Sequence, residues 1–170
     1  MATGEQMPIT IHPMTSAHGP SVLAIYEAGI STGNATFQTA APTWEEWDAT
    51  HLKSCRLVAL EDNKVLGWAA LTPVSGRCVY AGVAEVSVYV ATAAQGKGTG
   101  TALLQALIQQ SEENKLWTLQ AGIFPENTGS IKIHEACGFR IVGRRERIGK
   151  MGDTWRDTLL LEKRSTKVGI

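Results

Sequence analysis

The sequence predicts a mixed α/β fold in which one central β-sheet carries helices on both of its faces. The chain has 170 residues, the size of one ordinary domain. Hydrophobic residues make up 44% and charged residues 19%, which is a globular composition. Segments with strand-like alternation are interleaved with segments of helical periodicity, an order typical of helices packed on a sheet. We expect one domain over residues 8–165, preceded by a flexible tail over residues 1–7.

The first elements are one short strand and two helices. Residues 8–12 alternate apolar and polar side chains and predict the strand. A helix running to about residue 29 follows, for which Thr15 or Ser16 is a suitable N-cap. A second helix is expected to begin after Thr43, because a threonine with a glutamate three residues on makes a capping box.

Three strands are expected in the middle of the chain. Residues 56–60 and 65–71 flank a polar turn at 61–64 and predict a hairpin. The third strand covers about residues 83–91, and its side chains alternate between two faces. One of these faces carries Glu85, Ser87 and Tyr89, and the other carries Val86, Val88 and Val90.

A further helix, a strand, a short helix and a final hairpin complete the pattern. Leucines at helical spacing predict a long helix over residues 99–114. Asn127 is a suitable N-cap for a later short helix, which Gly138 is expected to end. The remaining expected elements are a strand at 116–123, the short helix at 130–137, and two strands at 139–148 and 154–161.

Charge and cysteine content narrow the function classes. Lysine plus arginine equals aspartate plus glutamate, at 16 each, which argues against a surface that coats nucleic acid. The three cysteines are far apart and lack the spacing of a zinc site, and unpaired cysteines suit a reducing cytoplasm. No apolar run approaches the roughly 20 residues of a membrane helix, and we expect neither a signal peptide nor a membrane partner.

The most informative segment is the glycine-rich turn at residues 95–100, with the sequence QGKGTG, just before the long helix. Glycines let backbone N–H groups approach an anion, and a helix N-terminus favours negative charge, so a diphosphate suits this turn. The Walker loop of ATP-binding proteins does not fit, because Gly98 follows Lys97 where serine or threonine is required. The dinucleotide pattern GxGxxG also fails, because its third glycine is missing. The pattern that fits is QxxGxG.

With this loop in place, the chain resembles the GNAT superfamily of N-acetyltransferases. The strand before the loop, the leucine-rich helix after it, and the element NxxSxxxHxxxGF at residues 127–139 stand in that family's order. Within the superfamily the chain is similar to the phosphinothricin and methionine sulfone acetyltransferases over about residues 8–163. The segments that carry this narrower resemblance are 25–26, 34–36, 67–69, 85–90 and 133–139.

The resemblance implies the acyl-CoA N-acyltransferase fold and acetyl-CoA as co-substrate. In this family the glycine-rich loop holds the pyrophosphate, and a splayed strand exposes backbone groups that bind the pantetheine arm and stabilise the oxyanion. No metal is implied, because the thioester is already activated. The residues expected to bind acetyl-CoA are Val88, Tyr89, Val90, Gln95, Gly96, Lys97, Gly98, Thr99, Gly100, Thr101, Asn127 and Ser130.

Two side chains are expected to take part in catalysis. Glu85 lies in an otherwise apolar strand, where it is either a structural ion-pair partner or a general base, and the resemblance places it beside the amine. His134, by itself, is more typical of a satisfied core histidine. By resemblance it replaces a tyrosine that protonates the leaving thiolate, and water is the alternative proton donor.

The substrate site is expected around the loop that follows residues 65–71. Arg77 offers bidentate hydrogen bonds to a carboxylate, although a loop arginine is more often a solvated surface charge. The residues expected to bind the substrate are Ser75, Gly76, Arg77, Tyr80, Glu85, Val86, Ser87, Thr36 and Phe37.

The expected function is direct transfer of an acetyl group from acetyl-CoA to the amino group of a small amino-acid-like molecule. Two alternatives stay open. One is an acetyltransferase that acts on a protein N-terminus or an aminoglycoside, and the other is a non-catalytic module that binds acyl-CoA. The resemblance also implies a homodimer.

Overall fold

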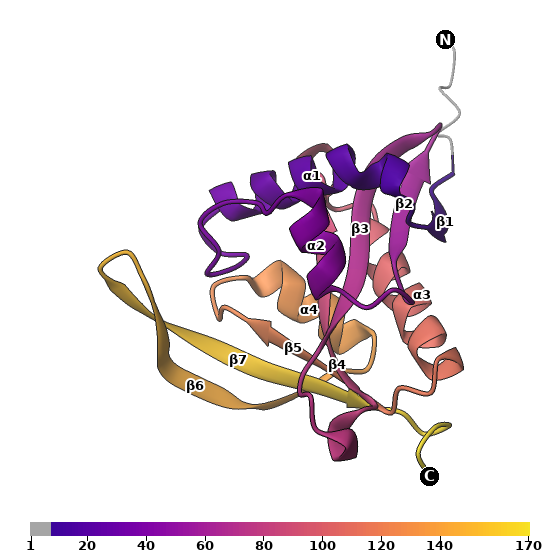
Figure 1. Cartoon of the computed structure of the whole chain (residues 1–170). Helices are drawn as coiled ribbons and strands as arrows, with labels where there is room; N and C mark the ends of the chain where they lie inside the picture. Colours follow the sequence, from indigo (N-terminus) through magenta and orange to yellow (C-terminus); the bar gives the residue numbers. More distant parts are fainter. Residues whose placement is uncertain (1–7) are drawn as a thin grey trace.

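The computed structural model describes residues 8–170, so the predicted tail over residues 1–7 lies outside the described residues. The described part folds into one seven-stranded sheet with four α-helices and three short 3-10 turns (Figure 1). The strands are β1 (Thr10–Pro13), β2 (Leu57–Glu61), β3 (Lys64–Pro73), β4 (Val83–Val90), β5 (Thr118–Ile123), β6 (Arg140–Met151) and β7 (Thr154–Arg164). The helices are α1 (Gly19–Ser31), α2 (Trp44–Thr50), α3 (Thr99–Glu113) and α4 (Thr128–Ala136), and the 3-10 turns are η1 (Ser16–His18), η2 (Cys78–Tyr80) and η3 (Thr92–Ala94).

The sheet has the strand order β1-β2-β3-β4-β5-β7-β6. Every neighbouring pair is antiparallel except β4 and β5, which run parallel because α3 crosses over between them. Helices α1 and α2 pack on one face and α3 on the other (Figure 1). The predicted mixed sheet with helices on both faces is therefore confirmed.

Two hydrophobic cores hold these layers together. The leucine stripe of α3, which includes the fully buried Leu103 and Leu107, packs against β2–β5. On the other face, Val22 of α1 and Trp47 of α2 are buried against Trp68 of β3. Full burial of side chains of this size contributes about 1.5–3 kcal/mol each. The periodic apolar stripes of the helices thus fix which helix covers which face.

Local signals placed two boundaries correctly. The Thr43 hydroxyl accepts a hydrogen bond from the Glu46 N–H at 3.2 Å and the Glu46 carboxylate accepts one from the Thr43 N–H at 3.2 Å, so the predicted capping box is present. The hairpin of β2 and β3 turns at Asp62 and Asn63, with φ angles of 48° and 64°. Aspartate and asparagine tolerate this left-handed backbone better than other side chains do.

Other boundaries differ from the predicted ones. Thr15, one of the two predicted N-caps, caps the 3-10 turn η1 and not the α-helix itself. The α-helix begins only at Gly19, with Pro20 in its first turn. Strands β6 and β7 run to Met151 and Arg164, beyond the predicted ends. They pair with each other along a largely exposed hairpin, and an exposed strand lacks the apolar alternation on which sequence prediction depends.

The chain after β7 turns back toward the end of that strand. The Arg164 guanidinium donates hydrogen bonds to the carbonyl groups of Ser165, Val168 and Gly169. Ordered contacts therefore continue past residue 165, the end that the sequence predicts for the domain. In residues 8–170, no helix has the length and hydrophobicity needed to span a membrane.

Candidate active site

Strands β4 and β5 separate part-way along their length. They pair in parallel only from Val83–Thr118 to Glu85–Gln120. Beyond that point β4 stays paired with β3 and β5 with β7. Among the described residues, the backbone N–H and C=O groups of 87–90 that face β5 therefore have no strand partner. Such groups are available to an extended ligand lying between the strands.

The glycine-rich loop lies at the end of the separated part of β4. Gly96 and Gly98 have left-handed φ angles of 76° and 81°, and a Cβ at either position would meet no atom within 4 Å. Gly98 is the N-cap of α3, whose first N–H groups have no partner within the helix. The buried hydroxyl of Thr99 also lacks a hydrogen-bond partner among residues 8–170. An anion at this helix end can satisfy these donors.

Gly100 brings three elements of the site together. A Cβ at this position would lie 3.0 Å from the Ile133 side chain on α4 and 3.4 Å from the Val90 side chain on β4. A larger residue would push α3 away from both neighbours. The glycine therefore allows the loop, the free edge of β4 and the middle of α4 to meet around one point.

The start of α4 is fixed by Asn127, as the sequence predicts. Its Oδ1 accepts a hydrogen bond from the Ser130 N–H at 3.3 Å. Its Nδ2 donates to the backbone carbonyl of Asn34 at 3.2 Å. Asn127 thus caps α4 and also joins it to the loop between α1 and α2.

His134 lies one turn further along α4 and is only 4% exposed. Its Nδ1 is 2.7 Å from the Ser130 carbonyl oxygen, and since that oxygen can only accept, Nδ1 carries a proton. Burial lowers the pKa of His134, and the hydrogen bond to Ser130 opposes this only in part. The neutral ring then has no proton on Nε2. A general acid needs a second proton there, so the acid role predicted for His134 requires the charged form that burial disfavours.

Glu85 lies where β4 and β5 part. The Gln120 Nε2 donates a hydrogen bond to Glu85 Oε1 at 3.4 Å, and the same oxygen lies 3.9 Å from where a Cβ of Gly122 would stand. The carboxylate therefore extends over β5, on the face that α1 and α2 cover elsewhere. Within residues 8–170 no lysine, arginine or histidine forms an ion pair with Glu85.

The loop between α1 and α2, residues 32–43, lies on the same face, and we call it the acceptor loop. Burial raises the pKa of Tyr89 on β4, and the nearby Thr36 side chain opposes this shift only in part. The Phe37 ring packs edge-on against Phe124 with centroids 4.9 Å apart. A Cβ at Gly149 would lie 2.8 Å from the Phe37 ring, so β6 also contacts the loop. Thr36 and Phe37 thus form a wall between β4 and the β6–β7 hairpin.

The loop between β3 and β4 brings its own predicted residues together. Ser75 accepts a hydrogen bond from the Arg77 N–H at 3.1 Å, and the Arg77 guanidinium lies 5.6 Å from the centroid of the Tyr80 ring. Arg77 and Tyr80 are both exposed. Among the described residues, no hydrogen bond or ion pair joins Arg77 to Glu85 or to the acceptor loop.

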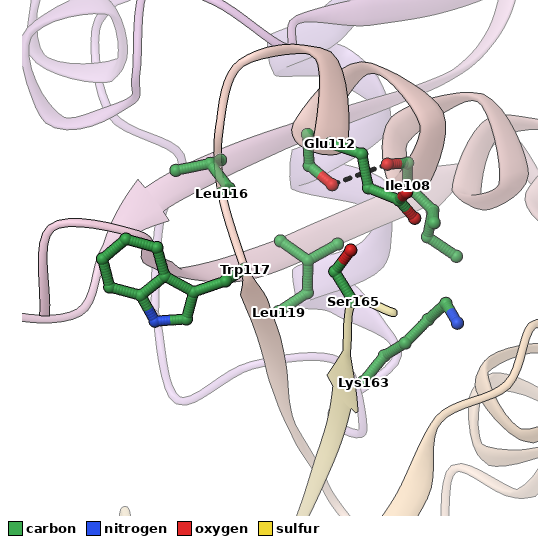
Figure 2. A pocket seen from close by; sticks show the side chains of 8 residues that line it. Ile108, Glu112, Leu116, Trp117, Leu119, Lys163 and Ser165 are labelled. Carbon is green, nitrogen blue, oxygen red and sulfur yellow. Dashed lines mark hydrogen bonds between the residues drawn. The ribbon is translucent and has the colours of Figure 1, made fainter. Parts of the chain in front are cut away.

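Two hollows lie away from Glu85. The smaller, about 10 Å³, is shown in Figure 2 and holds no more than one water molecule. It is lined by Ile108, Ser111, Glu112, Leu116, Trp117, Leu119, Lys163 and Ser165. The larger, about 470 Å³, lies between the β2–β3 turn and the glycine-rich loop and is lined by Glu61, Asp62, Lys64, Leu66, Ala93, Ala94 and Lys97. The candidate catalytic residues lie in neither hollow, so the separated strands define the site better than cavity size does.

This combination of a separated parallel pair, a left-handed glycine loop and a capped α4 matches a known family. Residues 24–139 match the Acetyltransferase (GNAT) family. The chain belongs to the GNAT family. The predicted fold and the predicted enzyme class, an N-acetyltransferase that uses acetyl-CoA, are thereby confirmed.

Named relatives support the narrower resemblance. A phosphinothricin N-acetyltransferase of Alcaligenes faecalis is 35% identical over 150 residues, which cover 85% of this chain and 76% of that protein. An L-methionine sulfoximine/L-methionine sulfone acetyltransferase of Pseudomonas paraeruginosa is 30% identical over 152 residues, which cover 84% of this chain and 87% of the relative.

Solved structures agree with the fold. A GNAT phosphinothricin acetyltransferase from Sinorhizobium meliloti in complex with acetyl-CoA has a TM-score of 0.85 and 26% identity, covering 96% of this chain and 91% of that one. A ribosomal-protein-alanine N-acetyltransferase from Brucella melitensis has a TM-score of 0.83 and 31% identity, and the match covers 92% of this chain and 99% of that one. The names of these two structures differ in the type of amine that the enzyme acetylates.

Sequence reasoning missed two residues of the site. Gln120 alternates with apolar residues on β5 as an ordinary outward side chain does, so nothing in its neighbourhood marks it as the partner of Glu85. Arg156 lies in the final hairpin, yet it contacts the acceptor loop at Gly33 and Asn34. No spacing rule connects residues so distant in sequence.

Proposed function

We propose that this GNAT protein acetylates the amino group of a small amino-acid-like substrate of the phosphinothricin and methionine sulfone type. The observation that carries the proposal is the position of Glu85, a carboxylate without an ion pair at the point where β4 and β5 separate. The named relatives at 35% and 30% identity support the substrate class.

The residues present fit acetyl-CoA. The N–H groups at Gly96–Gly100 and the start of α3 suit its pyrophosphate, and the free edge of β4 at residues 87–90 suits the amides of its pantetheine arm. Asn127 and Ser130 stand at the start of α4, the helix whose Ile133 side chain lies beside Gly100. When bound, acetyl-CoA supplies an activated thioester, so transfer needs no metal.

In the proposed reaction, Glu85 accepts the proton of the attacking amine through a water molecule. The backbone N–H groups on the free edge of β4 stabilise the charge that develops on the carbonyl oxygen. His134 donates a proton only in its doubly protonated form. Because its pKa is lowered, we assign the proton of the leaving thiolate to water at neutral pH and to His134 in acid.

Arg77 is proposed to bind the carboxylate of the substrate, with Tyr80 beside it. Its guanidinium is exposed and has no carboxylate partner among residues 8–170, so it is free to do so. The acceptor loop, with Thr36 and Phe37, supplies the opposite wall.

We further propose a homodimer in the cytoplasm. The β6–β7 hairpin exposes four large apolar side chains, Ile141, Val142, Ile148 and Trp155. Exposed apolar groups of this kind are typical of protein interfaces. The free cysteines suit a reducing compartment. Sedimentation of the full chain at micromolar concentration tests the dimer.

The experiment that tests the function is a thiol-release screen with acetyl-CoA. The amines are phosphinothricin, methionine sulfone, methionine sulfoximine, the common amino acids, a peptide with N-terminal alanine, and an aminoglycoside. We expect release with the first three amines, and the Glu85→Gln variant serves as the control for release at this site. Turnover confined to the peptide or the aminoglycoside contradicts the substrate class. Tight acetyl-CoA binding without release for any amine identifies a non-catalytic module.

A further inference from the structure

Arg156 of β7 contacts two segments that are distant from it in sequence, residues 33–34 and residues 124–126. Its Nη1 donates to the Gly33 carbonyl at 2.9 Å, and its Nη2 donates to the Asn34 Oδ1 at 2.9 Å. Its Nη2 also lies 3.3 Å from a Glu126 carboxylate oxygen. The guanidinium stands 4.0 Å from the centroid of the Phe124 ring, the ring against which Phe37 packs.

These contacts suit an arginine and no other side chain. The guanidinium is planar and presents donors in a fixed fork, so it reaches two acceptors at once while its flat face lies on an aromatic ring. The Arg156 side chain is 14% exposed, whereas that of its ion-pair partner Glu126 is 58% exposed. The hydrogen bond to the Gly33 carbonyl is part-buried, whereas the bonds to Asn34 and Glu126 are exposed.

A chain of hydrogen bonds continues from Arg156 to the middle of α4. Asn34, which Arg156 holds by its side chain, accepts a bond from Asn127 through its backbone carbonyl. Asn127 accepts a bond from the Ser130 N–H, and the Ser130 carbonyl accepts one from His134. Figure 1 shows the acceptor loop between α1 and α2 on the same side of the molecule as the β6–β7 hairpin.

We infer that Arg156 is a positioning residue that fixes the acceptor loop as the wall of the substrate site and aligns it with the capped start of α4. The inference rests on the proposed function, because it assigns the acceptor loop to the amine substrate. Arg156 acts through Gly33 and Asn34 and through the Phe124–Phe37 pair. Loosening this loop displaces the substrate relative to Glu85, and small misplacements of this kind cost up to about a hundredfold in rate.

The kinetic test compares Arg156→Gln and Arg156→Lys with the parent. We expect Arg156→Gln to lower kcat/KM for the amine roughly ten- to a hundredfold, mainly through a higher KM for the amine. The KM for acetyl-CoA should change less than about threefold, because Asn127 still caps α4. Arg156→Lys keeps the charge and loses the fork, so it should recover no more than about a third of the loss on a logarithmic scale.

Arg144→Gln is the matched control. Arg144 lies in the same hairpin and pairs with Asp157 at 2.6 Å, but it has no hydrogen bond to the acceptor loop. The Arg144→Gln variant should keep its KM for the amine and its KM for acetyl-CoA within about twofold of the parent values. An equal effect of Arg144→Gln and Arg156→Gln on the amine KM overturns the proposal, because loss of any hairpin arginine would then suffice.

Hydrogen exchange supplies a readout that needs no substrate. Arg156→Gln should increase exchange of the amides in residues 32–43 at least about tenfold and leave α3 unchanged. If no amine is acetylated, this measurement still decides whether Arg156 holds the loop, so the two proposals fail separately. Unchanged exchange in residues 32–43 overturns the proposal, as does faster exchange without any change in the amine KM.

Asn34→Ala provides a milder variant and a double-mutant cycle. Asn34 is exposed, so its truncation removes the contact with Arg156 at little cost to folding. If Arg156 acts through Asn34, the double variant should lose much less than the product of the two single losses. Independent, multiplicative losses contradict this path.

Discussion

Gln120 stands directly opposite Glu85 in the last parallel pair of β4 and β5, and its Nε2 donates a hydrogen bond to Glu85 Oε1 at 3.4 Å. The amide orients the carboxylate without neutralising its charge. The alternative role considered for Glu85, a structural ion pair, has no partner among residues 8–170. A carboxylate that is oriented but not ion-paired suits a general base.

Glu85→Gln should therefore lower kcat by about 10²–10⁴-fold, the usual contribution of general-base catalysis. The loss should be largest at neutral pH and below, where most of the amine is protonated. Cofactor affinity should stay nearly unchanged. Steady-state kinetics across pH provide the measurement, and a loss below about threefold at every pH would falsify the base assignment.

Gly98 tests the placement of the pyrophosphate. Asparagine tolerates the left-handed backbone of this position, and a Cβ added to Gly98 would meet no atom within 4 Å. Gly98→Asn and Gly98→Asp have nearly the same shape and differ in charge. We expect the aspartate variant to bind acetyl-CoA at least about tenfold more weakly than the asparagine variant, because a carboxylate repels the pyrophosphate. Equal dissociation constants by calorimetry would place the pyrophosphate elsewhere.

Arg77 tests recognition of the substrate carboxylate. A charged hydrogen bond of this kind contributes roughly 1.5–3 kcal/mol. At about 1.4 kcal/mol per tenfold, Arg77→Ala should lower kcat/KM for an amino-acid-like substrate roughly ten- to a hundredfold. The effect should shrink for the matching methyl ester or amide, which lacks the negative charge. If acid and ester suffer alike, Arg77 shapes its loop and does not bind the carboxylate.

His134 should make stability depend on pH. Its pKa in the folded protein is lowered from 6.5 by burial, so the unfolded chain binds a proton more readily. The contribution of neutral His134 to the free energy of unfolding is fully present above the unfolded pKa of about 6.5. It is lost as the pH falls from there through the lower pKa of the folded protein. His51 contributes in the same direction, because burial also lowers its pKa.

Urea unfolding at pH 7.5 and pH 5.5 checks this pH dependence. His134→Gln removes one titrating group, so its loss of stability between the two pH values should be smaller than that of the parent. His12→Gln, on the exposed edge strand β1, serves as the control. An identical loss in His134→Gln and the parent would show that His134 does not titrate in this range.

Much of the fold and part of the site followed from short segments of the chain. The capping box at Thr43, the cap at Asn127 and the glycine-rich loop at residues 95–100 each depend on neighbours within a few residues. Apolar periodicity identified the helices, since burial on one face selects residues at helical spacing. Glu85 could be identified in the same way, because its neighbours along the chain show that it is a carboxylate in a largely apolar strand.

The tertiary structure alone decided which distant residues meet. Sheet order places Gln120 beside Glu85, and the β6–β7 hairpin brings Arg156 to Gly33 and Asn34, more than a hundred positions away. The proton on His134 likewise depends on its burial and on the Ser130 carbonyl. Such contacts arise from the packing of whole elements, whereas periodicity, caps and turns record only interactions between neighbours along the chain.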